Sequence, residues 1–376
     1  MIRTSTIATA LFLMICVYRL DVSAHEVLKN RTSSEKNRTL VYVSGPFKAS
    51  FDGQKIENMI VKSDDMRPAI TVDGFHNVKI KNVIVYHSNG PGIVINRSQN
   101  ANISDTVVVN IGAPERGQNI GSMPERRVNI QAVFSNNLTI SNVYVEKGAA
   151  GVYLFRSDHA IIKKIEGFDI RGPLPRGQLV QFDKCKYPTL DTFSVINPGR
   201  TSWTEDAINS YGSIKPTIRN GYIEGLNSPK GVGVLIENGE GGWGGLVENV
   251  DVRYWVNGAF SAATDSEGVT FKNVRAYDGL AIGIISDSAG NVSFDGSTVP
   301  TLEQWAQDNF RGEPTSGQEA FHSFNSKKMS NINFINAGYF NLARKGRVAW
   351  DINKMSRQEF SAINIPPRPR FSFKMK

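Results

Sequence analysis

The residues best suited to chemistry lie between positions 178 and 245, where acidic and aromatic side chains gather. Carboxyl groups on either side of a bond can move protons to and from it, and an exposed Trp ring suits stacking on a sugar ring. The candidate catalytic residues are Asp183, Asp206, Glu237, Lys184 and Arg200. The candidate substrate-binding residues are Glu205, Tyr211, Trp203, Trp243, Gln181 and Asn209.

A sequence repeat must position these residues. It begins near Phe51 and recurs mostly every 22 to 29 residues, with two longer intervals of 37 and 40. Each unit begins with an apolar anchor. The residue two positions after the anchor is Asn in 7 of 11 units, and in most units the residue five positions after it is apolar. The anchors are Ile56, Ile80, Ile103, Ile140, Ile162, Leu190, Ile218, Val247, Phe271, Phe294 and Phe334. Such a period predicts a solenoid, because one unit cannot bury its own apolar face.

Residue types within the repeat favour strands over helices. The segments 78–85 and 138–145 alternate apolar and polar residues with period two, and they are rich in Val and Ile. Asn between two such segments suits a tight bend, since it tolerates left-handed backbone angles. A further strand lies about ten residues before each anchor. We therefore predict an all-β, single-domain parallel β-helix of about eleven coils, with three strands per coil, a triangular cross-section and an inner Asn ladder.

Aligning the strands of three successive coils brings the acidic residues together. One outward row should contain Gln181, Asn209 and Leu235, and the next should contain Asp183, Tyr211 and Glu237. Because coils are about 4.8 Å apart, the backbones at Asp183 and Glu237 would be roughly 10 Å apart. Tilted side chains would then suit a water-activating carboxyl pair. Glu205 and Asp206 should enter the same face from the other end of the strand.

The same residues also fit other kinds of chemistry. A lyase needs a base and a group that neutralises a uronate carboxylate, for which Lys184, Arg200 and Arg156 are candidates. The four carboxylates of the cluster suit Ca²⁺, but the chain has no EF-hand or Gly-Asp nonapeptide repeat, so a metal stays unassigned. Acidic residues at strand ends also cap turns, and aromatic and amide groups alone would make a binding module. Lyase, hydrolase and binding-only hypotheses therefore remain open.

The cluster also carries a family resemblance. The segments 180–183, 205–213, 216–220 and 231–234 resemble the secreted bacterial right-handed parallel β-helix proteins of the pectin-lyase-like superfamily, and the likeness extends over about 51–340. It implies right-handed coils and an acidic polysaccharide as substrate, for a lyase, hydrolase or epimerase. The segment 204–209 is similar to the Asn-Thr-Asp-Gly-Ile-Asp motif of polygalacturonases. No Gly-Asp-Asp or Gly-His-Gly follows it, which argues against polygalacturonase chemistry.

The N-terminus predicts export. Arg3 precedes an apolar stretch at 7–17, and Val22-Ser23-Ala24 fits signal-peptidase cleavage after Ala24. We expect a secreted or periplasmic protein, without a transmembrane segment in the mature chain. Cleavage leaves Cys185 as the one cysteine, which we interpret as a packed thiol. The net charge of +8 favours an anionic partner, and a secreted chain without a nucleic-acid motif favours polysaccharide over nucleic acid.

The repeat also divides the chain. We predict a signal peptide at 1–24, an N-terminal cap at 25–50 and the β-helix at 51–345, with loop insertions at 110–128 and 300–325. The insertion near 300 begins with a capping box that predicts a short helix. Residues 346–376 are expected to form a C-terminal strap or tail, and the protein is expected to be a monomer. Three functions follow: a polysaccharide-active enzyme, a non-catalytic carbohydrate-binding protein, or a component of exopolysaccharide assembly or the cell surface.

Overall fold

The computed structural model describes most of the chain between residues 40 and 360. The described ranges are 40–113, 126–172, 175–198, 201–202, 204–226, 231–255, 258–277, 282–287, 293–295, 298–301, 321–324, 333–335, 338–341, 346–351 and 356–360. Side chains are described up to residue 275, apart from 254 and 255 within those ranges. The predicted signal peptide, Arg200, Trp203, most of both loop insertions, the predicted short helix and residues 361–376 lie outside the described residues.

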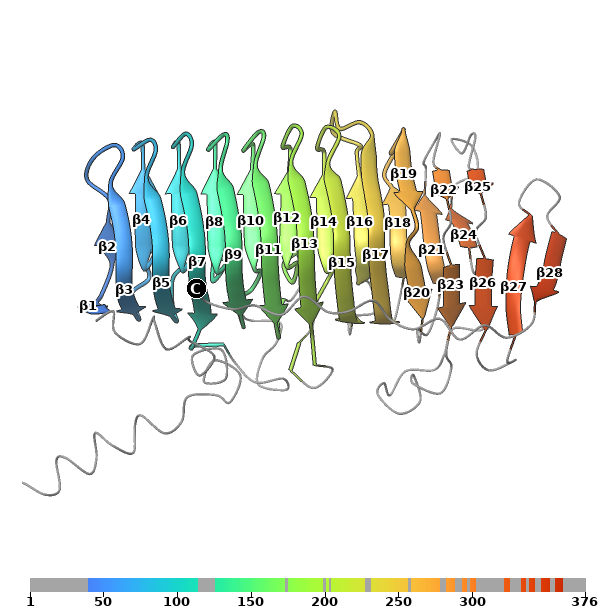
Figure 1. Cartoon of the computed structure of the whole chain (residues 1–376), viewed down its shortest axis with the longest axis horizontal. Helices are drawn as coiled ribbons and strands as arrows, with labels where there is room; N and C mark the ends of the chain where they lie inside the picture. Colours follow the sequence, from blue (N-terminus) through green and yellow to red (C-terminus); the bar gives the residue numbers. More distant parts are fainter. Residues whose placement is uncertain are drawn as a thin grey trace, which may run out of the picture.

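The strands stack coil upon coil into two sheets along the long axis of the molecule (Figure 1). The 11-stranded sheet, here called the short-strand sheet, contains β2 (Phe47–Lys48), β4 (Ile70–Asp73), β6 (Ile93–Asn96), β8 (Ile130–Val133), β10 (Val152–Phe155), β12 (Val180–Asp183), β14 (Ile208–Tyr211), β16 (Val232–Glu237), β18 (Gly258–Ala263), β21 (Ile282–Asp287) and β24 (Phe321–Phe324). Neighbouring strands in this sheet are parallel throughout.

The 17-stranded sheet, here called the long-strand sheet, takes the rest of each coil. It contains β1 (Val41–Ser44), β3 (Lys55–Ser63), β5 (Lys79–His87), β7 (Asn102–Asn110), β9 (Thr139–Glu146), β11 (Ile161–Phe168), β13 (Thr189–Ile196), β15 (Thr217–Leu226), β17 (Gly245–Trp255), β19 (Val269–Lys272), β20 (Arg275–Tyr277), β22 (Ser293–Asp295), β23 (Thr298–Thr301), β25 (Asn333–Ile335), β26 (Gly338–Asn341), β27 (Gly346–Asp351) and β28 (Ser356–Phe360). Only β26–β27 and β27–β28 pair antiparallel among the described strands.

The predicted fold class is confirmed, and the number of coils differs slightly. The solenoid has about 8 regular turns, fewer than the eleven predicted, and less regular coils bring the short-strand sheet to 11 strands. The units after Asn273 consist of shorter strands, so the apolar anchors Phe294 and Phe334 continue the sequence pattern in less regular coils. Within the described ranges there is no helix long and apolar enough to cross a membrane.

Asn residues bend the long strands as predicted, but their side chains lie in a different place. Asn58, Asn82 and Asn142 have φ values of 56°, 52° and 51°, and each divides its strand into two segments. The amide of Asn82 donates to Oδ1 of Asn58 at 2.7 Å, and that of Asn273 donates to Asn249 at 2.6 Å. This ladder is half-buried or exposed on the outside of the bend, so the prediction of an inner ladder is wrong. The inside of the coil is filled by aliphatic and Phe side chains.

The core consists of apolar side chains stacked in register. Ile56, Ile80 and Ile103 occupy equivalent positions on neighbouring strands, and none is more than 1% exposed. The stack also matches large residues with small ones. A Cβ at Gly221 would lie 2.0 Å from the ring of Phe193 on the preceding coil, so only glycine fits beneath that ring. Coil-to-coil packing therefore fixes side-chain size as well as polarity.

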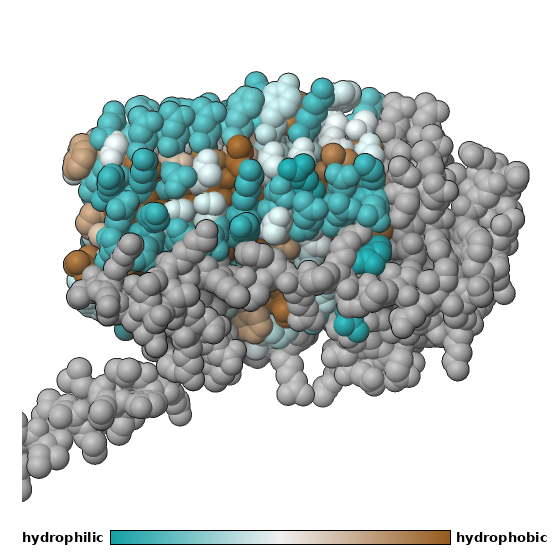
Figure 2. Space-filling model, in the orientation of Figure 1, coloured by the Kyte–Doolittle hydropathy of each residue, from teal (hydrophilic) through white to brown (hydrophobic). Residues whose placement is uncertain are grey.

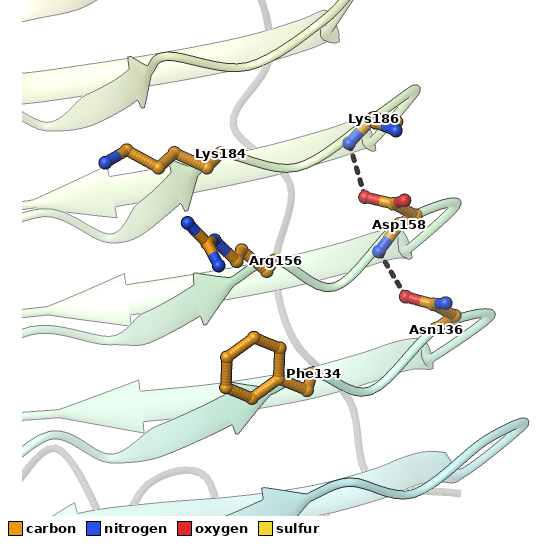
Figure 3. A pocket seen from close by; sticks show the side chains of 6 residues that line it. All are labelled: Phe134, Asn136, Arg156, Asp158, Lys184 and Lys186. Atoms are coloured by element: carbon orange, nitrogen blue, oxygen red, sulfur yellow. Dashed lines mark hydrogen bonds between the residues drawn. The ribbon is translucent and has the colours of Figure 1, made fainter. Parts of the chain in front are cut away.

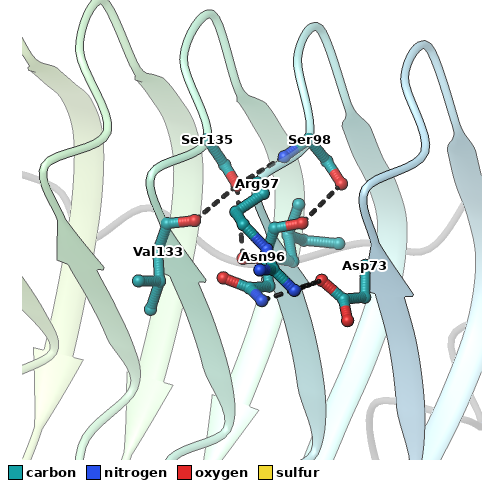
Figure 4. Close-up of polar contacts among 7 residues, drawn as sticks. Asp73, Asn96, Arg97, Ser98, Val133 and Ser135 are labelled. Atoms are coloured by element: carbon teal, nitrogen blue, oxygen red, sulfur yellow. Dashed lines mark hydrogen bonds and ion pairs between the residues drawn. The ribbon is translucent and has the colours of Figure 1, made fainter.

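A buried ladder of small polar side chains follows the short strands (Figure 4). The N–H of Ser98 donates to Oγ of Ser135 at 3.2 Å, and the N–H of Ser135 donates to Oγ of Ser157 at 3.1 Å. Cys185 takes the next place, with its Sγ 3.4 Å from the N–H of Ser157. Its own N–H donates to Oγ of Ser213 at 3.0 Å. The thiol thus replaces a hydroxyl, and burial raises the pKa of Cys185 to about 12.

The outward positions of the coils are mostly polar where they meet solvent. Figure 2 shows hydrophilic side chains in bands that cross the described coils on one face. Such bands are what strand alternation predicts, because equivalent outward positions of successive coils lie side by side. One set of outward positions on the long strands departs from this rule and is described below.

Candidate functional site

The structure places the candidate residues of the short-strand sheet in the predicted register. Gln181 pairs with Asn209 and Asn209 with Leu235, while Asp183 pairs with Tyr211 and Tyr211 with Glu237. The strands β12, β14 and β16 therefore present two outward rows on one face. Asp183 and Glu237 flank Tyr211 and are separated by two strand spacings, about 10 Å at the backbone.

Asp206 lies beneath this face rather than on it, although it was predicted to enter the face. Its side chain is 1% exposed. Oδ1 accepts the N–H of Val232 at 2.9 Å, and Oδ2 accepts the amide of Asn209 at 3.1 Å. Burial raises the pKa of Asp206 well above its ordinary value, and the nearby charge of Glu205 adds to this rise. The buried Asp206 can position its neighbours, but it does not face a ligand on the outer surface of the short-strand sheet.

Asn209 connects Asp206 to the surface carboxylate. Its Nδ2 donates to Oε2 of Glu237 at 2.9 Å as well as to Asp206. Glu237 is half-buried and accepts the hydroxyl of Thr264 at 3.3 Å through its other oxygen. The Oδ1 atom of Asn209 is buried and has no hydrogen-bond partner in the described part of the chain. A buried acceptor of this kind suits a water molecule or a ligand hydroxyl.

Asp183 is held by a tyrosine that sequence reasoning missed. Tyr153, on the preceding coil, donates its hydroxyl to Oδ2 of Asp183 at 2.7 Å. Burial, and then the nearby carboxylate, raise the pKa of Tyr153, so this hydroxyl stays a donor. Arg176 lies over the Tyr153 ring at 4.3 Å and donates to Oε1 of Gln181 at 3.0 Å. Tyr153 occupies the same outward row as Gln181, so extending that row by one coil would have found it.

Lys184 is engaged by a partner that the repeat did not indicate. Its Nζ lies 2.5 Å from Oε2 of Glu240, and the hydroxyl of Tyr211 donates to the other oxygen at 2.7 Å. The hydrogen bonds from Lys184 and Tyr211 lower the pKa of Glu240, while Glu240 raises the pKa of Tyr211 to about 12. An ion-paired lysine is poorly suited to act as a base. Glu240 follows β16 in a glycine-rich turn, where residue type alone gave no signal.

Of the remaining candidates, one lies at the outer face of the short-strand sheet and the others lie beside it or outside the described residues. Glu205 accepts the amide of buried Gln178 at 3.2 Å, which places it at the start of the strand face. Trp243 is 49% exposed, but it lies in the turn after β16 and stacks under Lys215, whose Nζ is 4.7 Å from the ring centre. Its backbone forms an isolated β-bridge with Ile214 and not with a residue of the acidic row. Trp203 and Arg200 lie outside the described residues.

A cationic cleft adjoins the acidic row at the end of the short strands (Figure 3). This turn cleft has a volume of about 330 Å³ and is lined by Phe134, Asn136, Arg156, Asp158, Lys184 and Lys186. The Arg156 guanidinium lies 5.2 Å from the Phe155 ring and 6.0 Å from the Phe134 ring. Phe134 is 45% exposed. The cleft thus offers an aromatic surface and positive charge next to Asp183.

The acidic residues do not form a metal site in the described part of the chain. No three His, Cys, Asp or Glu side chains are grouped closely enough there to hold an ion. Two of the carboxylates predicted as Ca²⁺ ligands, Asp206 and Glu237, accept hydrogen bonds from the same Asn209 amide instead. The arrangement fits proton transfer and carbohydrate binding better than cation coordination.

Comparison with known proteins identifies the fold. The family described as "right handed beta helix region" matches residues 39–172. This match covers about a third of the chain, which has a right-handed parallel β-helix fold. Its handedness, implied by the resemblance in the sequence, is thereby confirmed. No curated protein matches this β-helix protein in sequence.

Solved structures agree on the fold. The Dettilon tailspike protein aligns with 85% of this chain at 13% identity and a TM-score of 0.51. The catalytic domain of a GH87 α-1,3-glucanase aligns with 78% of it at 12% identity and a TM-score of 0.47, and a Thermotoga maritima exopolygalacturonase aligns with 80% at 10% and 0.47. The β-helix protein spans 62% of the glucanase domain, 85% of the exopolygalacturonase and 57% of the tailspike. At 13% identity the likeness to the tailspike shows the fold alone, and the two structures with TM-scores of 0.47 add nothing to that conclusion.

Proposed function

We propose that this β-helix protein binds an extracellular polysaccharide along the outer face of the short-strand sheet and hydrolyses it with Asp183 and Glu237. One observation carries the proposal. Two half-buried carboxyl groups stand two coils apart in one outward row, and each is oriented by a neutral donor, Tyr153 for the first and Asn209 for the second. Their backbones are about 10 Å apart with Tyr211 between them, so a sugar and an attacking water would lie above the Tyr211 side chain.

The charges around the row favour hydrolysis over a lyase reaction. A lyase would use a cationic side chain or a tyrosine as base, but Lys184 is ion-paired with Glu240, and an arginine such as Arg156 does not give up its proton in proteins. The pKa values of Tyr153 and Tyr211 are raised, which disfavours their deprotonated forms. Two carboxyl groups are sufficient for glycoside hydrolysis, with one as general acid and the other as general base. Asp206 then acts as a positioning residue through Asn209.

An acidic polysaccharide is the substrate class that the surface favours. The turn cleft places Arg156 and Lys186 beside the acidic row, and Phe134 offers a ring for stacking on the sugar. The formal net charge of +8 would attract a polyanion over longer distances. The proposal rests on these groups rather than on the solved structures with the same fold.

The test is turnover of polysaccharides by the mature protein and two variants. On a substrate found in a panel of uronic and neutral polysaccharides, Asp183→Asn and Glu237→Gln should each reduce the release of reducing ends by about 10²- to 10⁴-fold. Glu248→Gln is the matched control, because Glu248 pairs with Lys272 on the long-strand sheet. Wild-type rates in both site variants would contradict the assignment. An unsaturated uronate product, followed by ultraviolet absorbance, would indicate a lyase instead.

Binding without turnover is the second candidate function. It is favoured by Phe134 and Trp243, two of the exposed aromatic side chains, and by the enclosure of Asp206. In affinity electrophoresis, a polysaccharide that binds the protein slows its migration through the gel. Phe134→Ala and Trp243→Ala should each reduce this retardation. If a polysaccharide is bound but none is turned over, and these variants abolish binding, the binding function replaces the enzyme.

A further inference from the structure

The two halves of each long strand carry different outward side chains. Before the Asn bend in β5, the outward residues Lys79 and Lys81 are exposed. After the bend, the outward residue Ile84 is 2% exposed. Its neighbours Val83 and Val85 belong to the interior core, so Ile84 points away from that core. An outward aliphatic side chain without solvent contact indicates that another layer covers this part of the sheet.

The covered positions form a second hydrophobic cluster, separate from the core. Ile84 pairs with Val107 and Val107 with Tyr144 on successive strands, and Val109 lies in the next row. Their exposed fractions are 2%, 2%, 3% and 4%. Ile60, Tyr86 and Phe168 pack against them from the strands, and Leu40 is the one described member of the cluster outside those strands. We call this set the outer apolar patch.

Farther along the stack the same outward rows contain acidic as well as apolar residues, because Phe168 on β11 and Ile196 on β13 lie between Glu146 and Glu224. Glu166 on β11 is aligned with Tyr144, and Glu224 on β15 continues the row that contains Val109 and Glu146. Tyr144 and Tyr222 donate their hydroxyls to Glu146 and Glu224. A partner for the whole face must therefore be apolar at β7–β9 and carry both apolar and basic groups at β11–β15.

Residues 361–376 carry the apolar and basic side chains that such a partner needs, with Arg368 and Arg370 before Phe371 and Phe373. The odd positions from 363 to 375 are all apolar, and they are Ile363, Ile365, Pro367, Pro369, Phe371, Phe373 and Met375. The even positions carry the charges of Arg368, Arg370, Lys374 and Lys376, and the segment contains no acidic residue. Proline fixes an extended backbone and removes a donor, so a segment of this kind favours lying across a surface over folding alone.

The segment is also long enough. Sixteen extended residues after Phe360 span up to about 53 Å at roughly 3.3 Å each. From β28 to β9 there are nine strand spacings, about 43 Å at ~4.8 Å each. Arg368 and Arg370 would then reach β17–β13, beside Glu224. Phe371 and Phe373 would reach β13–β9, at the outer apolar patch.

We propose that residues 361–376 dock as an extended strap on the outer apolar patch and the acidic positions beside it. Phe371, Phe373 and Met375 cover the aliphatic side chains, while Arg368 and Arg370 lie along the edge of the strap, from where their long side chains reach Glu224. The strap would lie on the long-strand sheet, whereas the polysaccharide is proposed to bind the outer face of the short-strand sheet. The strap would cover the outer apolar patch with a segment of the same chain, without a second molecule.

The first experiment removes the strap. A chain that ends at Phe360 should bind an apolar fluorescent dye more strongly than the full chain and unfold at a lower temperature. A synthetic peptide of residues 361–376 should reverse both effects, whereas a peptide with Phe371 and Phe373 changed to Ser should not. Unchanged dye binding and melting temperature after truncation would overturn the proposal.

The second experiment keeps the full chain, in case the truncated chain does not fold. A photo-crosslinking amino acid at Phe373 should link to peptides from β7 or β9 of the same chain, and one at the solvent-facing position Ser372 should link there less. Links to the short-strand sheet would overturn the strap, and links between chains would show that a second copy covers the patch. A cover made by residues 25–39 would be shown by links from that segment to the patch together with none from Phe373.

Discussion

At the scale of the residue, Asp206 shows how the fold changes the chemistry of a side chain. In sequence it is one of two adjacent acidic residues, but in the structure Val232 and Asn209 donate to its carboxyl group inside the protein. Glu237, linked to it by the same Asn209 amide, remains half-buried at the surface. Two carboxyls with one shared donor therefore have different environments, and only the outer one is suited to meet a substrate.

The raised pKa of Asp206 has a consequence for stability. Its folded pKa lies above the ordinary value of 3.8, so the folded state holds the proton more tightly than the unfolded state does. The stabilisation from this group is complete below about pH 4 and is lost as the pH rises through the folded pKa. Asp206→Asn mimics the protonated form. It should stabilise the protein at neutral pH by on the order of 1 kcal/mol for each unit of pKa shift removed.

Thermal unfolding of wild type and Asp206→Asn across pH 4 to 8 would check this. The advantage of the variant should shrink as the pH falls toward the ordinary value of 3.8. Glu205→Gln serves as the comparison, because it removes the neighbouring charge and leaves the buried carboxyl in place. A variant that is less stable than wild type by the same amount at every pH would show that the Asp206 carboxylate is needed as an acceptor.

At the scale of the element, the turns hold the coils together through side chains that accept backbone hydrogen bonds. The ladder from Ser98 to Ser213 gives each buried N–H an acceptor on the next coil, with Cys185 in a serine position. The outer Asn ladder adds contacts at the bend, where left-handed backbone favours Asn. The apolar repeat fills the coil, and these polar ladders link the turns of successive coils.

Substitutions at Cys185 should separate packing from hydrogen bonding. Cys185→Ser should leave the free energy of unfolding within about 1 kcal/mol of wild type, because a hydroxyl can accept the Ser157 N–H. Cys185→Val keeps an apolar side chain but removes the acceptor, and should cost about 1 to 3 kcal/mol. Urea denaturation measures both. Equal stability of the two variants would mean that the thiol acts by packing alone. The native thiol should also resist thiol reagents until the protein unfolds, since its pKa is near 12.

At the scale of the whole molecule, a solenoid has no long-range core and depends on contacts between successive coils. Removal of the predicted signal peptide would leave Cys185 as the remaining cysteine, so coil stacking would then maintain stability without an internal disulfide. The end coils need covers, and in the described structure β27 and β28 pair antiparallel at one end of the long-strand sheet.

Export is the prediction that belongs to this scale. An Arg near the start, an apolar stretch at 7–17 and small residues at 22 and 24 should direct cleavage after Ala24. Mass spectrometry of protein recovered outside the cytoplasm should therefore find an N-terminus at or near His25. Ala24→Leu, which places a bulky residue at the cleavage position, should leave an uncleaved precursor. An intact Met1 on a cytoplasmic protein would contradict both export and an extracellular partner.

The sequence by itself determined the fold class and the register of the site rows. The apolar anchors repeat at every coil, so positions such as Asp183, Tyr211 and Glu237 can be aligned by counting from them. Burial of Asp206 and the ion pair of Lys184 with Glu240 could not be obtained in this way. They depend on turns of unequal length, whose side chains meet the neighbouring coil at distances that no period fixes. The repeat is a local property that recurs, whereas these contacts form between coils and exist only in the tertiary structure.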